Sequence, residues 1–299
     1  MKNLISELSA KNISFIIDEP MKNHTTFKTG GNASVFICPK NEEELSLILK
    51  LIKQNNMKPF ILGNGSNLLV DDEGIKDRPV IYIDDGFSCI KLIDETTIEV
   101  GAGASLSSLC RFALENCLTG LEFAFGIPGS CGGAAFMNAG AYGGEMKDVV
   151  LRCNHIDFDG NKGYYSKEDL DFGYRHSVYS DSDCVITSIV LSLEKGEKEE
   201  IHAKMRELLQ RRKDKQPLEY PSAGSVFKRP EGYFAGALIE QAGLKGKRIG
   251  GAMVSEKHAG FIINYDNATT KDVLDLVKYC QDTVMEKFGV MLEREIKSV

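Results

Sequence analysis

The segment from Gly126 to Gly144 constrains this chain more than any other part of its sequence. It holds seven glycines in 19 residues, in a chain whose 29 glycines among 299 residues exceed the usual share of about 7%. It lies in the longest stretch without a charged residue, Phe123 to Gly144. That length suits a membrane span, but the glycines, one proline, Ser130 and Asn138 leave too few large apolar side chains for one.

So many small residues exceed what a turn needs, because a turn uses one or two glycines. They are typical of a backbone that a large group approaches closely over many residues. A second small-residue loop, residues 63–67 (GNGSN), follows a short apolar strand, where its backbone N–H groups could hold a phosphate. Taken alone, this loop is better interpreted as an ordinary turn, since it matches neither the Walker nor the Rossmann pattern. Together the two loops suggest a dinucleotide whose pyrophosphate is bound by backbone N–H groups.

The overall composition excludes several classes of protein. The chain has 36 Lys and Arg against 43 Asp and Glu, a net charge of −7, whereas a dedicated nucleic-acid binder needs a concentrated basic face. The first 15 residues are charged at Lys2, Glu7 and Lys11 and have no apolar core, which predicts a cytoplasmic protein. The eight cysteines show no CxxC pattern and no paired spacing with the histidines, so we expect small buried residues and no metal site.

Periodicity and turn residues predict an α+β fold of two domains. The expected helices cover 41–55 with Asn41 as cap, 106–117 with Ser105 as cap, about 200–212 with Leu209 inward, 235–241, and 269–288 with Phe288 inward. The expected strands cover 60–62, 68–70, 80–83, 90–93, 97–100, 149–158, 163–165, 184–193, 258–265 and 290–296. The strand 184–193 is apolar on both faces and is expected at the centre of a sheet. The charged run 194–200 is the best linker candidate, which divides the chain near residue 197.

Two further patches carry residues capable of chemistry. Arg175 lies between Tyr174 and His176, and is either an ordinary surface arginine or a guanidinium that grips a substrate carboxylate. We expect a structural role for His176, because a neighbouring arginine favours its neutral form. Ser222 and Ser225 lie on a glycine-containing turn without the features of a nucleophilic serine, which leaves open a serine that passes a proton.

Two patches near the C-terminus have simple interpretations as well. The basic glycine loop 243–252, which contains Lys245, is either a solvated turn or an anion site. Glu293 and Glu295 alternate with Leu292, Arg294 and Ile296 on the last expected strand, where an exposed edge explains both.

Seven segments, in register, closely resemble the UDP-N-acetylenolpyruvoylglucosamine reductase (MurB) family of peptidoglycan synthesis. They are NHTTFKTGG (23–31), LGNGSNLLV, GIPGSCGGAAFMNAGAYGGE, GYRHS, QPLEYPSAGSVFKRP, AGLKGKRIGGAMVSEKHAGFIIN and FGVMLEREI. The resemblance spans nearly the whole chain. It is to the shorter subtype, since little sequence separates Arg175 from the strand at Cys184, where the longer subtype has an extra tyrosine-bearing loop.

The resemblance implies a two-lobed FAD-binding domain of the vanillyl-alcohol-oxidase (PCMH) type over residues 1–197, with the lobes split near 71–80. It implies an α+β substrate-binding domain over 198–299, whose last strand, 290–296, returns to the active site. FAD is expected to bind non-covalently, with Cys131 as a small packing residue. The expected FAD-binding residues are Gly63, Asn64, Gly65, Ser66, Asn67, Gly129, Ser130, Gly132, Gly133, Asn138 and Gly140.

The implied reaction has two halves that share one pocket. NADPH reduces the flavin and leaves; UDP-N-acetylglucosamine enolpyruvate then enters, accepts a hydride and a proton, and becomes UDP-N-acetylmuramate. By resemblance, Arg175 and Glu295 polarise the substrate carboxylate, with Glu295 protonated or sharing a proton, and Ser225 donates the proton. Tyr174, Lys228, Arg229 and Lys245 are expected to contact the UDP-sugar. Lys28 replaces the usual arginine of its segment, which leaves its role open.

Two alternative functions are consistent with parts of the sequence. One is another flavin oxidase or dehydrogenase of the same cofactor fold, which would need a different substrate domain. The other is a nucleotide-binding module without chemistry, whose flavin NADPH would not reduce. We expect neither nucleic acid, nor membrane, nor an obligate protein as a partner.

Overall fold

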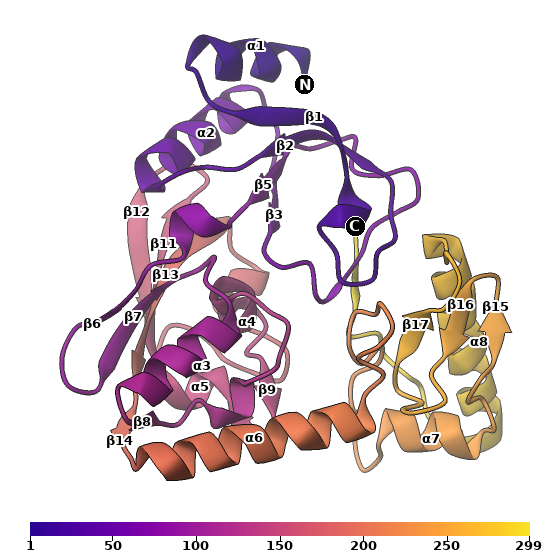
Figure 1. Cartoon of the computed structure of the whole chain (residues 1–299). Coiled ribbons are helices and arrows are strands. Elements are labelled where there is room, and N and C mark those ends of the chain that lie inside the picture. Colours follow the sequence, from indigo (N-terminus) through magenta and orange to yellow (C-terminus); the bar gives the residue numbers. More distant parts are fainter. The chain divides into compact units, whose positions relative to one another are not determined.

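The structure, a computed structural model, describes residues 1–299 and divides into two compact units (Figure 1). The first unit comprises residues 1–17, 35–64 and 78–211, and the second comprises 18–34, 65–77 and 212–299. The chain passes between the two units more than once, so this division differs from a single boundary near residue 197. The assignment of 1–197 to FAD and 198–299 to substrate stays a prediction. No helix is both long and apolar enough to cross a membrane.

The first unit is built on an antiparallel five-stranded sheet (Figure 1). Its strands, in spatial order, are β12 (Lys162–Ser166), β11 (Val150–Asp157), β13 (Cys184–Ser192), β7 (Thr97–Gly101) and β6 (Ile90–Leu92). The central place of β13 confirms the expectation from its apolar sequence. Residues 185–187 and 189–191 are all buried there, as a strand covered on both faces requires.

A second, four-stranded sheet has the order β1 (Phe15–Pro20), β2 (Asn32–Ile37), β5 (Val80–Tyr82) and β3 (Phe60–Leu62). β5 pairs in parallel with both β2 and β3. Helix α1 (Lys2–Ala10) precedes this sheet, and α2 (Glu42–Gln54) lies between β2 and β3 in the chain. Asn41 caps α2 by accepting the Glu44 N–H at 2.9 Å, which confirms the expected start of this helix.

The glycine-rich segment contains a helix that the sequence did not predict, α4 (Cys131–Phe136). Its sequence, CGGAAF, has two glycines and so a low helix propensity. Contacts distant in sequence fix it instead: the Cys131 N–H donates to Ala104 O and the Gly132 N–H to Ala102 O, both at 2.8 Å. The preceding helix is α3 (Leu106–Glu115), capped by Ser105 as expected.

Several glycines of this segment are required by the packing of the chain itself. A Cβ atom at Gly132 would lie 2.8 Å from Ala102 Cβ, and one at Gly140 would lie 2.7 Å from Glu145 Cγ. A Cβ atom at Gly144 would lie 2.6 Å from the Phe123 ring. At these positions the packing of neighbouring chain segments by itself requires glycine.

Short elements complete the first unit. They are β8 (Leu118–Thr119), β9 (Gly140–Ala141), β10 (Gly144–Glu145), α5 (Met146–Val149), β14 (Glu194–Lys195) and the 3-10 turns η2 (Asp85–Phe87), η3 (Glu122–Ala124) and η4 (Val178–Ser180). β14 pairs with β8, so the charged run at 194–200 is partly a strand and not a free linker. Helix α6 (Lys198–Lys215) follows it with Ile201, Met205 and Leu208 buried, whereas Leu209, expected inward, is half-buried.

The second unit packs helices against a small antiparallel sheet of β15 (Arg248–Ile249), β16 (Ala252–Val254) and β17 (Ile262–Asn264). Its helices are α7 (Ala235–Gln241) and α8 (Thr270–Phe288), preceded in the chain by the 3-10 turn η1 (Met21–Asn23). Two distant segments also pair in parallel, β4 (Leu68–Leu69) and β18 (Lys297–Ser298). Phe27 and Leu69, from the N-terminal part of the chain, lie in the same core as Val273 and Val277 of α8.

Two expected strands of this unit are wrong in extent. Residues 290–296 form no strand, because the N–H groups of Glu295 and Ile296 both donate to Val226 O, which breaks the regular ladder. The strand expected from 258 is shortened to β17, because the Gly260 N–H donates to His258 Nδ1 and the Phe261 N–H to His258 O in a tight turn.

Candidate active site

The two small-residue loops meet within the first unit. A Cβ atom at Gly63, directly after β3, would lie 2.5 Å from Ser130 Oγ, at the start of α4. Glycine at 63 therefore allows the loop after β3 to contact the loop before α4.

Four backbone N–H groups at this junction donate no hydrogen bond within the chain, those of Gly63, Asn64, Gly129 and Ser130. Ser130 is only 2% exposed. A buried N–H without a partner costs free energy unless a ligand or water accepts from it. This junction therefore fits the phosphate oxygens of a dinucleotide such as FAD.

Other predicted FAD residues use their polar groups within the chain. The Gly132 N–H donates to Ala102 O, and the Gly133 N–H donates to Ser130 Oγ at 3.3 Å. The Asn138 side chain is fully buried and hydrogen-bonded on both sides of its amide. Contacts of Gly132, Gly133, Asn138 and Gly140 with FAD stay predictions.

The remainder of the GNGSN loop belongs to the second unit. A Cβ atom at Gly65 would lie 2.1 Å from His24 O, so only glycine fits there, with a φ of +58°. Asn67 Nδ2 donates to Glu295 O at 3.2 Å, and the Lys297 N–H donates to Asn67 O at 3.0 Å. Asn67 thus holds the C-terminal segment that carries Glu295. No hydrogen bond links Ser66 to the rest of the chain.

Arg175 lies on a tight turn of the first unit. Gly173 and His176 exchange backbone hydrogen bonds at 3.1 and 3.3 Å, which leaves Tyr174 and Arg175 at the tip. Arg175 has a φ of +58°, a left-handed conformation that is unfavourable for a long side chain. Its guanidinium lies 4.9 Å from the centre of the Tyr174 ring. His176 Nε2 lies 3.3 Å from Asp171 Oδ2, which supports the structural role expected for this histidine.

The backbone segments that carry Ser225 and Glu295 are paired in the second unit. The segment 225–228 is extended between two others: the Val226 N–H donates to Gly260 O at 2.9 Å, and the Glu295 N–H donates to Val226 O at 2.8 Å. Both side chains are half-buried. The Ser225 hydroxyl makes no hydrogen bond within the chain.

The three predicted substrate-binding cations of the second unit each have a local partner. Lys228 Nζ lies 2.5 Å from Glu293 Oε1, and Lys245 Nζ lies 2.6 Å from Glu240 Oε1. The Arg229 guanidinium lies 4.0 Å from the centre of the Phe234 ring. Glu293 and Glu240 are exposed, and such surface ion pairs contribute only about 0–1 kcal/mol, so an anionic ligand can displace them.

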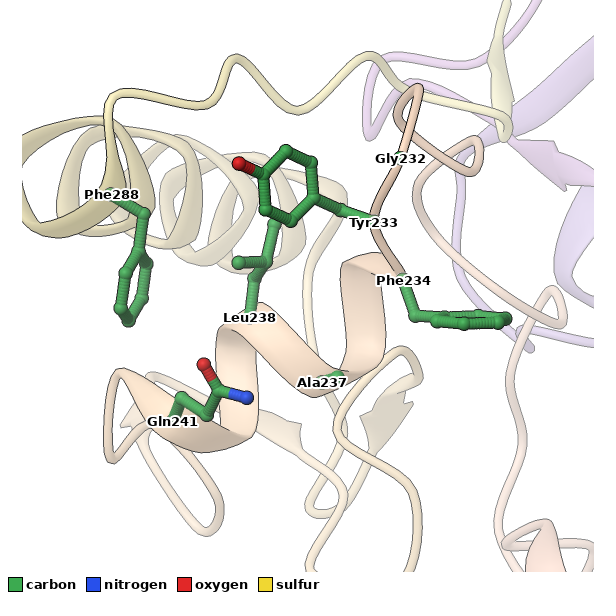
Figure 2. A pocket seen from close by; sticks show the side chains of 7 residues that line it. All are labelled: Gly232, Tyr233, Phe234, Ala237, Leu238, Gln241 and Phe288. Carbon is green, nitrogen blue, oxygen red and sulfur yellow. The ribbon is translucent and has the colours of Figure 1, made fainter.

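A cavity of about 360 Å³ is lined in part by Phe234, the ring that Arg229 contacts (Figure 2). Figure 2 shows Tyr233 and Phe234 on the segment before α7 and Phe288 at the end of α8. Its lining residues are Gly232, Tyr233, Phe234, Ala237, Leu238, Gln241 and Phe288. Phe288, expected inward, is 36% exposed because it faces this cavity.

A polar cavity of about 520 Å³ includes Lys28, the residue whose role the sequence left open. Lys22, Asp72, Asn264 and Thr269 are among its other lining residues. Lys28 has a left-handed φ of +60° and is exposed. None of the predicted catalytic residues lines this cavity.

His258 is a residue of this region that the sequence analysis missed. Its turn lies beside Ser225, because Gly260 O accepts the Val226 N–H. Burial lowers the pKa of His258, with a smaller contribution from Lys245 in the same direction, so the ring is neutral near pH 7. The apolar pattern of 258–265 predicted a strand, and a turn of the form His-x-Gly gives no distinct signal in the sequence, so His258 was not singled out. No group of three or more His, Cys, Asp or Glu side chains is placed to bind a metal ion.

Comparison with known proteins connects this geometry with a family. The family described as UDP-N-acetylenolpyruvoylglucosamine reductase, C-terminal domain, matches residues 216–299, and an FAD binding domain family matches residues 33–161. A UDP-N-acetylenolpyruvoylglucosamine reductase of Caldanaerobacter subterraneus subsp. tengcongensis is 52% identical over 285 residues, 95% of this chain and 93% of the relative.

Solved structures agree with these matches. The crystal structure of UDP-N-acetylenolpyruvylglucosamine reductase (MurB) from Thermus caldophilus is similar with a TM-score of 0.81 and 38% identity, over 96% of this chain and 98% of that one. An alkyldihydroxyacetonephosphate synthase structure matches with a TM-score of 0.51 at 15% identity, over 65% of this chain and 41% of that one, which shows a shared fold alone. The expected fold class, an α+β FAD-binding domain followed by a C-terminal domain, is confirmed.

Proposed function

Since the chain belongs to the UDP-N-acetylenolpyruvoylglucosamine reductase family, we propose that it reduces UDP-N-acetylglucosamine enolpyruvate to UDP-N-acetylmuramate. It is an FAD-binding oxidoreductase, with NADPH as the electron donor. The observation that supports the proposal is the backbone pairing of 225–228 with 293–296, the two segments that carry Ser225 and Glu295. A shared pocket for both ligands and a cytoplasmic location are parts of the proposal.

The bound flavin would supply the hydride that reduces the enol double bond. Arg175 would grip the substrate carboxylate with two parallel hydrogen bonds, as its planar guanidinium allows. The charge that develops next to this carboxylate is negative, so Arg175 stabilises it, and Glu295 does so in its protonated form. These two residues would therefore act most strongly in the transition state.

Ser225 would donate the proton that completes the reduction. Its hydroxyl is not engaged by any other group of the chain, so it can turn toward a substrate. A serine hydroxyl is a weak acid and transfers a proton only to a strongly basic carbon, in a site from which water is excluded. Lys228, Arg229, Lys245 and Tyr174 would bind the UDP-sugar, and release of Glu293 and Glu240 would free the two lysines for the diphosphate.

The first experiment separates the two halves of the reaction. Purified protein is mixed anaerobically with NADPH, and the flavin absorbance is expected to bleach. Addition of the enolpyruvyl UDP-sugar is then expected to restore it, with formation of UDP-N-acetylmuramate. Bleaching without substrate-driven recovery would favour another flavin dehydrogenase, and no bleaching would favour a binding module.

Ser225→Ala tests the proton donor. We expect NADPH to bleach the flavin at the wild-type rate and the substrate-driven recovery to slow by about 10²- to 10⁴-fold, the usual contribution of a positioned acid. Ser222→Ala is the matched control, since it removes a hydroxyl from the same turn and should leave both rates unchanged. Equal losses in both half-reactions of Ser225→Ala would contradict a role in proton transfer.

A further inference from the structure

The turn that carries Arg175 is fastened at two points to the end of α4 and the residues just after it. Ser177 Oγ donates to Phe136 O at 2.7 Å, and Asn138 Nδ2 donates to Gly173 O at 2.9 Å. Ser177 and Asn138 are both 0% exposed. One bond lies on each side of Arg175 in the chain, so together they fix both arms of its turn.

The amide of Asn138 is fully used within the protein. Its Nδ2 group also donates to Glu145 Oε2 at 3.0 Å, and its Oδ1 atom accepts the Lys147 N–H at 2.9 Å. Both amide protons are therefore engaged, and none is left to donate to a ligand. The residue has a φ of +41°, which asparagine tolerates better than most residues.

The Glu145 carboxyl that accepts from Asn138 is held in its charged form. Lys147 Nζ lies 2.8 Å from Glu145 Oε2 and lowers the pKa of that carboxyl, with Asn138 and then Arg175 acting in the same direction. Glu145 is thus a carboxylate that accepts from Asn138 and attracts the guanidinium of Arg175. The attraction between Glu145 and Arg175 and the hydrogen bond from Asn138 to Gly173 O therefore act on the same turn, residues 173–176.

These two hydrogen bonds bear on function because α4 connects them to the proposed cofactor loop. Ser130, with its unpaired N–H, caps one end of α4, and the turn of Arg175 is bound at the other end. Six helical residues at a rise of about 1.5 Å each separate the two ends by roughly 9 Å. A short, internally bonded segment therefore sets the distance between the proposed cofactor loop and Arg175.

We propose that Asn138 is a positioning residue that holds the Arg175 turn at this distance, and that it is not an FAD ligand. The inference rests on the proposed function, because the carboxylate that Arg175 grips belongs to the proposed substrate. Displacement of a positioned group by about 1 Å can slow a reaction about 10²-fold.

Asn138→Asp is the first test. It keeps the shape and the left-handed tolerance but replaces the donor by a carboxylate that faces Glu145 Oε2 and Gly173 O. We expect flavin content, FAD affinity and bleaching by NADPH to stay within about twofold of wild type, and substrate-driven recovery to slow by about 10- to 100-fold. Loss of FAD affinity would instead support an FAD ligand and overturn the inference.

Asn56→Asp is the matched control. Asn56 also has a left-handed φ, +54°, but it is exposed, and although its backbone N–H donates to Lys53 O, its side-chain amide makes no hydrogen bond. The same substitution there should leave both half-reactions unchanged. Asn138→Gly serves as the second variant if Asn138→Asp does not fold, since glycine accepts the backbone conformation without adding a charge.

A double-mutant cycle tests whether Asn138 acts through Arg175. If it does, Asn138→Asp added to Arg175→Lys should slow substrate-driven recovery by no more than about twofold beyond Arg175→Lys alone. Losses that multiply would show an independent, general structural effect and overturn the inference.

Hydrogen exchange separates failure of the inference from failure of the proposed function. Amides of residues 173–177 should exchange about tenfold faster in Asn138→Asp than in wild type, while β13 keeps its protection. Unchanged exchange at 173–177 would overturn the inference, even in an enzyme that reduces the proposed substrate. Faster exchange together with a wild type that does not reduce it would overturn only the function.

Discussion

At the scale of single residues, His155 shows how the sheet accommodates a polar ring. Its Nδ1 atom lies 2.9 Å from the hydroxyl of Tyr179, which donates to Cys153 O at 3.2 Å. Gly163 faces it on β12, and a Cβ atom there would lie 2.8 Å from His155 Nε2. Burial lowers the pKa of His155, and Asp157 opposes this only in part. The folded state therefore favours the neutral ring.

This shift makes stability depend on pH. Because the folded pKa is the lower one, the unfolded chain binds more protons, and the free energy of unfolding falls as pH drops below the unfolded pKa of about 6.5. We expect His155→Gln to flatten this fall between pH 7 and pH 5, measured by urea denaturation. His258 shifts in the same direction and keeps part of the slope. The exposed His202→Gln is the control, and an equal flattening there would contradict the assignment.

At the scale of elements, α8 begins where its sequence indicates. Thr269 Oγ1 accepts the Asp272 N–H at 3.0 Å and Asp272 Oδ2 accepts the Thr269 N–H at 3.0 Å, a reciprocal capping box. Asp72 adds a cap from elsewhere in the chain by accepting the N–H groups of Thr270 and Lys271. The first cap is local in the sequence, whereas the second comes from a residue 198 positions away from Thr270.

Thr269→Ala measures the local cap. We expect it to lower the free energy of unfolding by about 0.5–2 kcal/mol, since one backbone N–H loses its partner. Thr283→Ala, in the middle of the same helix, removes a hydroxyl that donates to Tyr279 O and caps no N–H group, so it should be nearly neutral. Denaturation midpoints of the two variants that coincide would argue against the cap.

At the scale of the whole molecule, the second unit depends on residues far from it in sequence. Phe27 and Leu69 are completely buried in its core, and β4 pairs with β18 near the C-terminus. The N-terminal part of the chain therefore supplies part of the core in which Val226, next to Ser225, is buried.

Phe27→Ala tests this dependence in the full-length chain. Loss of a buried aromatic ring is expected to lower the free energy of unfolding by about 3–5 kcal/mol. Phe234→Ala is the control, because Phe234 is 61% exposed and stacks only on Arg229, which contributes about 1 kcal/mol or less. A small effect of Phe27→Ala on chemical denaturation would show that residues 18–34 are not part of this core.

The sequence by itself determined the elements whose signals are local. The Asn41 cap and the apolar run of β13 each depend on residues within one strand or one helical turn, so they were predicted correctly. The motifs also identified the family and the cofactor class. The contacts of the predicted site residues with ligands stay predictions.

Only the tertiary structure decided how distant segments use their polar groups. α4 forms in a glycine-rich sequence because Ala102 and Ala104 accept its first N–H groups, and the expected strand at 290–296 is interrupted because Val226 O accepts two donors. The hydrogen bond from Asn138 to Gly173 spans 35 residues. Such bonds depend on which segments the fold brings together, and no local pattern of residues encodes that.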